Sequence, residues 1–362
     1  MYRRQFLQTL NAMGASISLP ASAFYYEGLS VITPTTTKPL VAPANAVEVA
    51  ASGWDIPKVG VVAVGGIGSA ILNQLNGRLP YLNRSIAIDT DVNALQRVKA
   101  DRKILVGDGT ALPLDLHAAR RLAQSSTPEI ADAVAGLDMV LLVTGMGGAA
   151  GSGIAPLVAQ MLHEQDILTL AFATLPFDFE SRQRKQDAQT GIRELRLYVN
   201  ALLPYFNGNI EQVAGENASF TSVSSQASLA FDQLWRGILN PVCRPGWVNI
   251  DFEDMRHMIL SHEGDCAFGF GTASAVEGPA VAARHAIDHP LLGQYRLQRA
   301  SALLMAVRAS RQVFQLGDSM AAMRNIKKQL SKDPWIIYGS YHDDTLDNEI
   351  TVSVLASGIR ET

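Results

Sequence analysis

The sequence predicts an α/β protein with a mostly parallel sheet covered by helices on both faces, a long central helix and a second, smaller α/β domain. Three observations support this fold class. The 362 residues, 48% hydrophobic and 18% charged, suffice for two ordinary domains with buried sheets. Short β-branched runs alternate with helical segments after residue 56, which is typical of parallel strands buried on both faces. Two glycine-rich turns directly follow such runs.

Composition also limits the partners and the metal sites. The formal net charge is −4 and no stripe of Lys and Arg with interleaved aromatic residues is present, so nucleic acid is not expected as a partner. Cys243 and Cys266 lack metal-ligand spacing and are expected to be two ordinary thiols. His285 and His289 have helical spacing, but Ala286 stands where a zinc hydrolase needs a glutamate. No protein-held metal cluster is therefore expected.

The first 55 residues differ from the rest of the chain, and three interpretations stay open. Arg3 and Arg4 precede a mildly apolar stretch and a run of small residues, which is the order of an export signal and resembles a twin-arginine signal. Apolar residues from Phe6 to Ile17 also recur at helical spacing, as in a helix that lies on a membrane surface. The third interpretation is a disordered tail. Residues 33–51, rich in Thr, Pro, Ala and Val, are expected to be a linker.

The first glycine-rich turn follows a predicted buried strand over residues 59–64. A helical face begins at Ala70, so the turn lies between a strand and a helix. Glycine allows backbone N–H groups to approach a phosphate without a Cβ in the way, and a helix N-terminus favours the negative charge. The predicted phosphate-binding residues of this turn are Gly65, Gly66, Ile67, Gly68 and Ser69.

The next predicted strand, residues 85–88, ends at Asp89. An acid at the end of the second strand commonly holds a ribose hydroxyl. A nicotinamide-binding dehydrogenase would explain the pattern up to this point equally well.

A second glycine cluster separates these alternatives. Residues 139–144 form another predicted buried strand, which opens into a glycine-rich turn and then a helix over residues 154–163. Two phosphate-binding turns at two strand ends indicate a nucleotide held from both sides, and a dinucleotide fold has no counterpart for the second turn. Neither turn ends in the Gly-Lys-Ser/Thr of a Walker loop. The predicted binding residues here are Gly147, Gly148, Ala149, Ala150, Gly151, Ser152 and Gly153.

Residues 144–159 resemble the signature of the FtsZ/tubulin family, and the resemblance continues in order from residue 56 to residue 359. Residues 59–70 look like the first phosphate loop of the family. The segment 175–184 is similar to the one that contains its ribose-contacting glutamate, and residues 245–254 match its Asn-x-Asp-Phe-x-Asp loop. The resemblance implies a Rossmann-like GTPase domain over residues 56–217, a central helix over 218–241 and a chorismate-mutase-like domain over 242–362.

The resemblance also implies the site and the mode of action. Glu180 would contact the ribose, Arg184 would lie near the nucleotide and Asn207 would lie beside the base. Asn249, Asp251 and Asp254 would act on the nucleotide of a neighbouring subunit, because in this family the acid loop completes the site when subunits stack. Taken alone, those acids also suit a helix N-terminus. GTP or GDP, accompanied by Mg²⁺, is the implied ligand.

Several departures from the family pattern bear on these expectations. The loop at residues 106–113 is shorter than in the family and contains an acid, and Ala150 and Ser152 replace two threonines of the signature. The family reads the guanine edge with an acid that would fall near Ser228 and Leu229, and neither of these residues is an acid. The chain has no residues beyond Thr362, where FtsZ has a spacer and a tail, so we expect a paralogue rather than the main ring-former.

Three functions therefore stay open: an assembling GTPase, a pseudo-GTPase scaffold that keeps the fold but not turnover, and a Rossmann-type oxidoreductase. The expected partner is a second copy in a head-to-tail homopolymer, or an orthodox FtsZ paralogue, in cell division or the cytoskeleton. The N-terminal segment, residues 1–55, would make membrane-surface contact in one interpretation. The expected location is the cytoplasm, with membrane association as an addition and export as the alternative.

Overall fold

The computed structural model describes residues 56–109, 115–207, 220–244, 246–262, 265–292, 294–330 and 334–359. The three interpretations of residues 1–55 lie outside the described residues, as does part of the loop at 106–113. Every element described below belongs to one compact unit, Ile56–Thr362.

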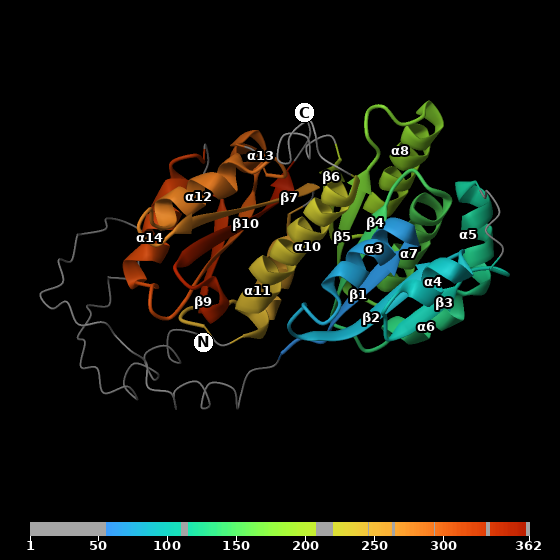
Figure 1. The fold of residues 1–362 in the computed structure, drawn as a ribbon, viewed down its shortest axis with the longest axis horizontal. Helices are drawn as coiled ribbons and strands as arrows, with labels where there is room; N and C mark the ends of the chain where they lie inside the picture. Colours follow the sequence, from blue (N-terminus) through green and yellow to red (C-terminus); the bar gives the residue numbers. More distant parts are fainter. Residues whose placement is uncertain are drawn as a thin grey trace, which may run out of the picture. The chain divides into compact units, whose positions relative to one another are not determined.

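The first sheet is six-stranded and entirely parallel, in the order β3-β2-β1-β4-β5-β6 (Figure 1). All six strands are covered by helices on both faces, and those in the middle of the sheet are almost wholly apolar and buried. They are β1 (Val59–Val64), β2 (Leu82–Asp89), β3 (Arg102–Leu105), β4 (Met139–Gly145), β5 (Leu168–Leu175) and β6 (Ala201–Phe206).

Two sets of helices cover the two faces of this sheet. One face packs against α3 (Gly65–Leu75), α4 (Val92–Arg97) and the long α10 (Phe220–Cys243). The other packs against α5 (Leu116–Ser125), α6 (Thr127–Val134), α7 (Ala155–Glu164) and α8 (Arg182–Arg196). The predicted doubly covered parallel sheet is confirmed.

The second sheet is smaller and mixed, in the order β7-β10-β8-β9. β10 (Glu349–Ile359) pairs antiparallel with β7 (Asp265–Ser274) and with β8 (Ala302–Ala309), whereas β8 and β9 (Trp335–His342) are parallel. Its outer face is covered by α12 (Pro279–Asp288), α13 (Gln294–Arg299) and α14 (Leu316–Lys327), and α11 (Phe252–Leu260) follows the central helix.

Helix α10 lies between the two sheets, as the sequence predicts (Figure 1). Trp235 and Phe231 are fully buried in a core that contains residues of both sheets, and the Trp235 indole N–H donates to the Pro80 carbonyl at 2.9 Å. The helix continues through Pro241, in its last turn. Within the described part of the chain, no helix combines the length and the hydropathy of a membrane span.

The glycine turns are shorter than predicted, because helical structure begins inside both of them. Helix α3 starts at Gly65, so the first glycine cluster forms the first turn of the helix rather than a separate loop. In the second cluster, a π-helical turn (Ala150–Ile154) precedes α7. Such π-helical turns frequently lie at functional sites.

Candidate functional site

Both glycine turns leave the first sheet at the point where its strand order reverses. β1 and β4 are neighbours, and Val64 is paired with Thr144 at their carboxyl ends. The Thr144 hydroxyl donates to the Val64 carbonyl at 3.2 Å. In open α/β sheets, ligands bind outside the carboxyl ends of the strands at this reversal.

The two turns touch each other, and glycine is required at several of the contacts. Gly65 has a φ of +75°, and a Cβ there would lie 3.3 Å from the Ala150 Cβ and 3.5 Å from the Gly151 nitrogen. A Cβ at Gly151 would lie only 1.9 Å from the Gly145 carbonyl oxygen, and one at Gly153 would lie 2.3 Å from the Leu116 carbonyl oxygen. These glycines are therefore fixed by backbone packing.

Two other glycines have open space around them. A Cβ on Gly66 or on Gly148 would meet no atom within 4 Å. Three residues after Gly66, the Ser69 hydroxyl is buried in the first turns of α3 without a hydrogen-bond partner. A buried hydroxyl donor at a helix N-terminus, with open glycine backbone nearby, is the chemistry that binds an anion such as a phosphate. These residues fit the phosphates of a nucleotide.

Ser152 is turned inward. Its side chain is fully buried, and its Oγ accepts the Gly147 N–H at 2.8 Å. Ala149 and Ala150 are partly buried against the hydrophobic core. The Ser152 hydroxyl therefore stabilises the second turn by a hydrogen bond inside it.

The start of α8 lies beside the second turn. A Cβ at Gly147, where φ is +96°, would lie 3.0 Å from the Arg184 carbonyl oxygen and 2.9 Å from Pro176 Cγ. Glu180 and Arg184 form an ion pair at 2.7 Å. The structure thus places Glu180 and Arg184 next to the predicted phosphate-binding turn.

Asp89 and Asn207 follow other strands at the same sheet edge. Asp89 is 5% exposed and accepts the backbone N–H groups of Thr90 at 2.7 Å and Asp91 at 3.2 Å. Burial raises the pKa of Asp89 above its usual value, against the opposing effect of these two hydrogen bonds. Asn207 directly follows β6 and is also buried. A polar side chain that sequence reasoning missed, Thr174 near the end of β5, has a buried hydroxyl without a partner.

The acid loop lies at the far end of α10. Asp251 is the N-cap of α11 and accepts the Glu253 N–H at 2.9 Å, and Asp254 is in the first turn. Asn249 accepts the Gly246 N–H at 2.6 Å, which shapes the loop before the helix. Val248 and Ser340 of β9 exchange two backbone hydrogen bonds, at 3.2 and 2.8 Å.

The acid loop and the glycine turns lie at opposite ends of the strands of the first sheet. Arg256 of α11 pairs at 2.7 Å with Asp166, which lies two residues before the amino end of β5. The glycine turns follow the carboxyl ends of the strands, and a strand the length of β5 spans roughly 26 Å. Within one chain, α11, with Asp251 as its N-cap and Asp254 in its first turn, is therefore held away from the glycine turns.

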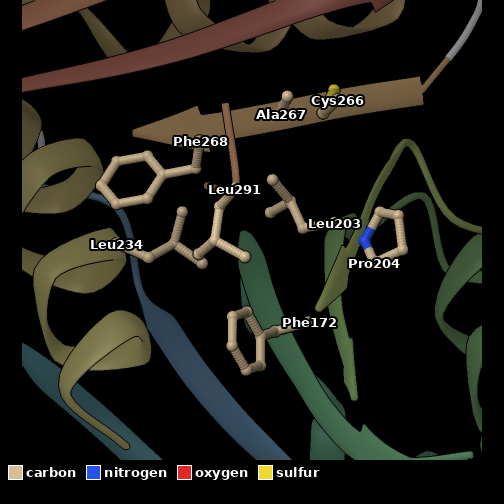
Figure 2. Close-up of a pocket in the computed structure, with 8 residues that line it drawn as sticks. All are labelled: Phe172, Leu203, Pro204, Leu234, Cys266, Ala267, Phe268 and Leu291. Atoms are coloured by element: carbon tan, nitrogen blue, oxygen red, sulfur yellow. The ribbon is translucent and has the colours of Figure 1, made fainter. Parts of the chain in front are cut away.

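A small cavity lies elsewhere, between the two sheets (Figure 2). Its volume of about 10 Å³ corresponds to about one water molecule. The lining is almost wholly apolar and comes from β5, β6, α10, β7 and Leu291, so it shares no residue with the glycine turns.

Comparison with known proteins identifies the family. The tubulin/FtsZ family GTPase domain matches residues 58–215, and the FtsZ family C-terminal domain matches residues 264–360. The chain is 32% identical to the cell division protein FtsZ of Pseudomonas aeruginosa, over 83% of this chain and 76% of that protein. This chain belongs to the tubulin/FtsZ family. The family decides against the oxidoreductase alternative, which the strand order alone leaves open.

Other members of the family differ in length from this chain. The cell division protein FtsZ of Caulobacter vibrioides is 33% identical over 84% of this chain, which spans 60% of the length of that relative. Among solved structures, an FtsZ dimer from M. jannaschii has a TM-score of 0.79 at 25% identity, covering 88% of this chain and 93% of that chain. CetZ2 from Haloferax volcanii, in a GTPγS-bound protofilament, shares the fold with a TM-score of 0.70 at 17% identity, over 84% of this chain and 94% of that one.

Proposed function

We propose that this protein binds GTP and GDP in the cradle formed by its two glycine turns. The support is the anion-binding chemistry at the strand-order reversal, where Gly66 and Gly148 leave open space and the Ser69 hydroxyl lacks a partner. Glu180 would accept hydrogen bonds from the ribose, with Asp89 and Asn207 at the same sheet edge. Mg²⁺ would enter with the nucleotide, held by phosphate oxygens and water, and would neutralise phosphate charge.

We propose further that hydrolysis occurs between two copies of the chain stacked head to tail. The supporting observation is that the acid loop is separated from the glycine turns. The ion pair between Arg256 and Asp166 holds α11 near the amino ends of the strands, whereas the glycine turns follow their carboxyl ends. Asp251 and Asp254 of one copy would then orient the attacking water at the nucleotide of the next copy, with Asn249 shaping their loop. A heterologous contact of this kind repeats into a filament.

The wider setting follows from the relatives and is part of the proposal. Proteins named for cell division are similar to this chain over most of its length, so we propose a cytoplasmic division or cytoskeletal role. The partner is a second copy or an orthodox FtsZ paralogue. The same proposal includes contact of residues 1–55 with a membrane surface. It also includes a GTPase domain over residues 56–217, a central helix over 218–241 and a second domain over 242–362.

The test is GTP hydrolysis measured against protein concentration, with sedimentation of the same samples. A site completed by a neighbour predicts that hydrolysis per chain rises with concentration and that sedimenting protein appears over the same range. Hydrolysis per chain that stays constant at all concentrations would contradict catalysis between copies.

One observation favours a second candidate, a nucleotide-binding scaffold without turnover. Ala150 has no hydroxyl. The Ser152 hydroxyl is fully buried and donates toward Met146 Sδ at 3.9 Å, so it is directed into the protein rather than toward a phosphate. This candidate predicts nucleotide-dependent sedimentation with no phosphate release in the same assay.

A further inference from the structure

The acid loop is held against the edge of the second sheet. Val248 and Ser340 of β9 exchange two backbone hydrogen bonds, at 3.2 and 2.8 Å. A Cβ at Gly246 would lie 2.3 Å from the Ser340 carbonyl oxygen, so this approach to β9 requires glycine. Ile250 is 1% exposed, and its N–H donates at 3.1 Å to a carbonyl in the last turn of α10. Backbone contacts therefore fix the loop on both sides of position 247.

The side chain of Trp247 adds a contact with a different part of the second sheet. Its ring stacks on that of Phe314, with the ring centroids 6.2 Å apart and the ring planes 13° from parallel. Phe314 lies in the turn between β8 and α14, where its N–H donates to the Ser310 carbonyl at 3.0 Å and its ring packs on the outer core of the sheet. Offset-stacked rings at this separation attract each other beyond the effect of their buried area. The stack therefore links the acid loop to a segment that is itself fixed.

The choice of tryptophan at this position is not explained by the stability of the loop alone. Within the described part of the chain, the indole Nε1–H of Trp247 is buried and has no hydrogen-bond partner. An unpaired buried donor destabilises the folded state, and a phenylalanine would provide a ring without that donor. Local conflicts of this kind are expected where the position of a segment matters for function.

The catalytic acids proposed above follow Trp247 closely in the chain. Asp251 is the N-cap of α11, and Asp254 lies in the first turn of the same helix. Both are therefore carried by a helix that starts directly from the anchored loop. A shift of the loop at Trp247 would move the two acids together, without any contact between the indole ring and a nucleotide.

We infer that Trp247, by stacking on Phe314, is a positioning residue that sets where Asp251 and Asp254 stand when they enter the site of a neighbouring copy. The inference rests on the proposed hydrolysis between copies. It adds to that proposal a residue that touches neither the nucleotide nor the acids.

The first test measures GTP hydrolysis, GTP affinity and sedimentation of the full chain. Trp247→Ala removes the stack, so hydrolysis per sedimented chain should fall at least about tenfold, since small displacements of catalytic groups have effects of this size or larger. Its dissociation constant for GTP should stay within about twofold of the wild-type value, because the glycine turns are unchanged.

Two further variants test whether the stack itself is responsible. Trp247→Phe keeps an aromatic ring and should retain at least about half of the wild-type rate. Phe314→Ala removes the other ring and should lower the rate as much as Trp247→Ala does. The double variant should be no slower than either single variant, because the two rings act as one unit.

Mixtures of variants distinguish a displaced acid loop from a general loss of structure. A Trp247→Ala chain keeps its glycine turns, so adding Gly148→Leu, which blocks the cradle but keeps the acid loop, should restore hydrolysis. Adding Asp254→Ala instead should not restore it, because both chains then have a defective acid loop. A Trp247→Ala chain that neither mixture restores would be a misfolded chain and would contradict a positioning role.

Hydrogen exchange gives a measurement that does not depend on turnover. Amides of residues 246–255 should exchange at least about tenfold faster in Trp247→Ala, because the stack opposes local opening of the loop. Amides of residues 145–153, in the second glycine turn, should exchange as in the wild type.

Three results would overturn the inference while leaving the proposed function intact. They are a Trp247→Ala variant with the wild-type rate, one whose rate falls only in proportion to lost GTP affinity or lost sedimentation, and one with unchanged exchange in the acid loop. A wild-type chain that binds GTP and sediments but never hydrolyses it would instead overturn the proposed hydrolysis, and the role of Trp247 with it.

Discussion

Gly148 and Gly151 lie three residues apart in the same turn, and the structure predicts opposite consequences for replacing them. A Cβ at Gly151 would lie 1.9 Å from the Gly145 carbonyl oxygen, which is backbone and cannot move aside cheaply. A side chain at Gly148 would project into space with no atom within 4 Å of its Cβ. Gly151→Ala should therefore change the stability of the fold, and Gly148→Leu should change the affinity for the nucleotide.

The expected magnitudes separate the two variants. Overpacking of this kind costs about 1–3 kcal/mol, so Gly151→Ala should lower the melting temperature by roughly 2–12 °C. Gly148→Leu should change the free energy of unfolding by less than about 0.5 kcal/mol, as substitutions without a steric conflict do. Because the leucine would occupy the proposed phosphate cradle, its affinity for GTP should fall at least about a hundredfold.

The assay measures the melting temperature and the dissociation constant for GTP of both variants and of the wild type. A Gly148→Leu variant that binds GTP with wild-type affinity would remove the second turn from the site. A Gly151→Ala variant as stable as the wild type would show that the close approach of residues 145 and 151 is not needed.

Two further predictions concern buried ionisable groups. Burial lowers the pKa of His289 to about 4, so between pH 6.5 and pH 4 the unfolded chain binds more protons than the folded chain. The free energy of unfolding should therefore fall by about 3 kcal/mol over this range. Unfolding curves of His289→Gln should lack this loss, and pH profiles identical to those of the wild type would refute the prediction. Burial also raises the pKa of both Cys243 and Cys266 to about 12. Iodoacetamide at pH 8 should therefore label neither thiol in the folded chain and both thiols in denaturant. Rapid labelling of the folded chain would contradict their burial.

The sequence allowed three strands of the first sheet, β1, β2 and β4, to be predicted, because each contains a short apolar run. The predicted strands at residues 59–64 and 139–144 begin where β1 and β4 begin. The order of the second sheet could not be predicted, because the central position of β10, the last strand of the chain, depends on pairings between residues far apart in sequence.

The sequence supplies the candidate site as a set of residues, but not their arrangement. Glycine is compatible with both a turn and a helix, so the pattern could not show that α3 begins at Gly65 or that a π-helical turn begins at Ala150. The inward direction of Ser152 and the unpartnered state of Ser69 depend on neighbours that only the packed structure defines. The pairing of Glu180 with Arg184 has i, i+4 spacing, which the sequence contains but does not distinguish from other such pairs.

The most direct test of catalysis between copies mixes two inactive variants. Asp254→Ala should retain nucleotide binding, because its own glycine turns are unchanged, and should lose turnover by roughly two to four orders of magnitude. Gly148→Leu should lose nucleotide binding and keep its acid loop. In a head-to-tail contact, the acid loop of a Gly148→Leu chain meets the intact cradle of an Asp254→Ala chain. The account predicts that GTP hydrolysis reappears in the mixture, and a mixture that co-sediments yet stays inactive would contradict it.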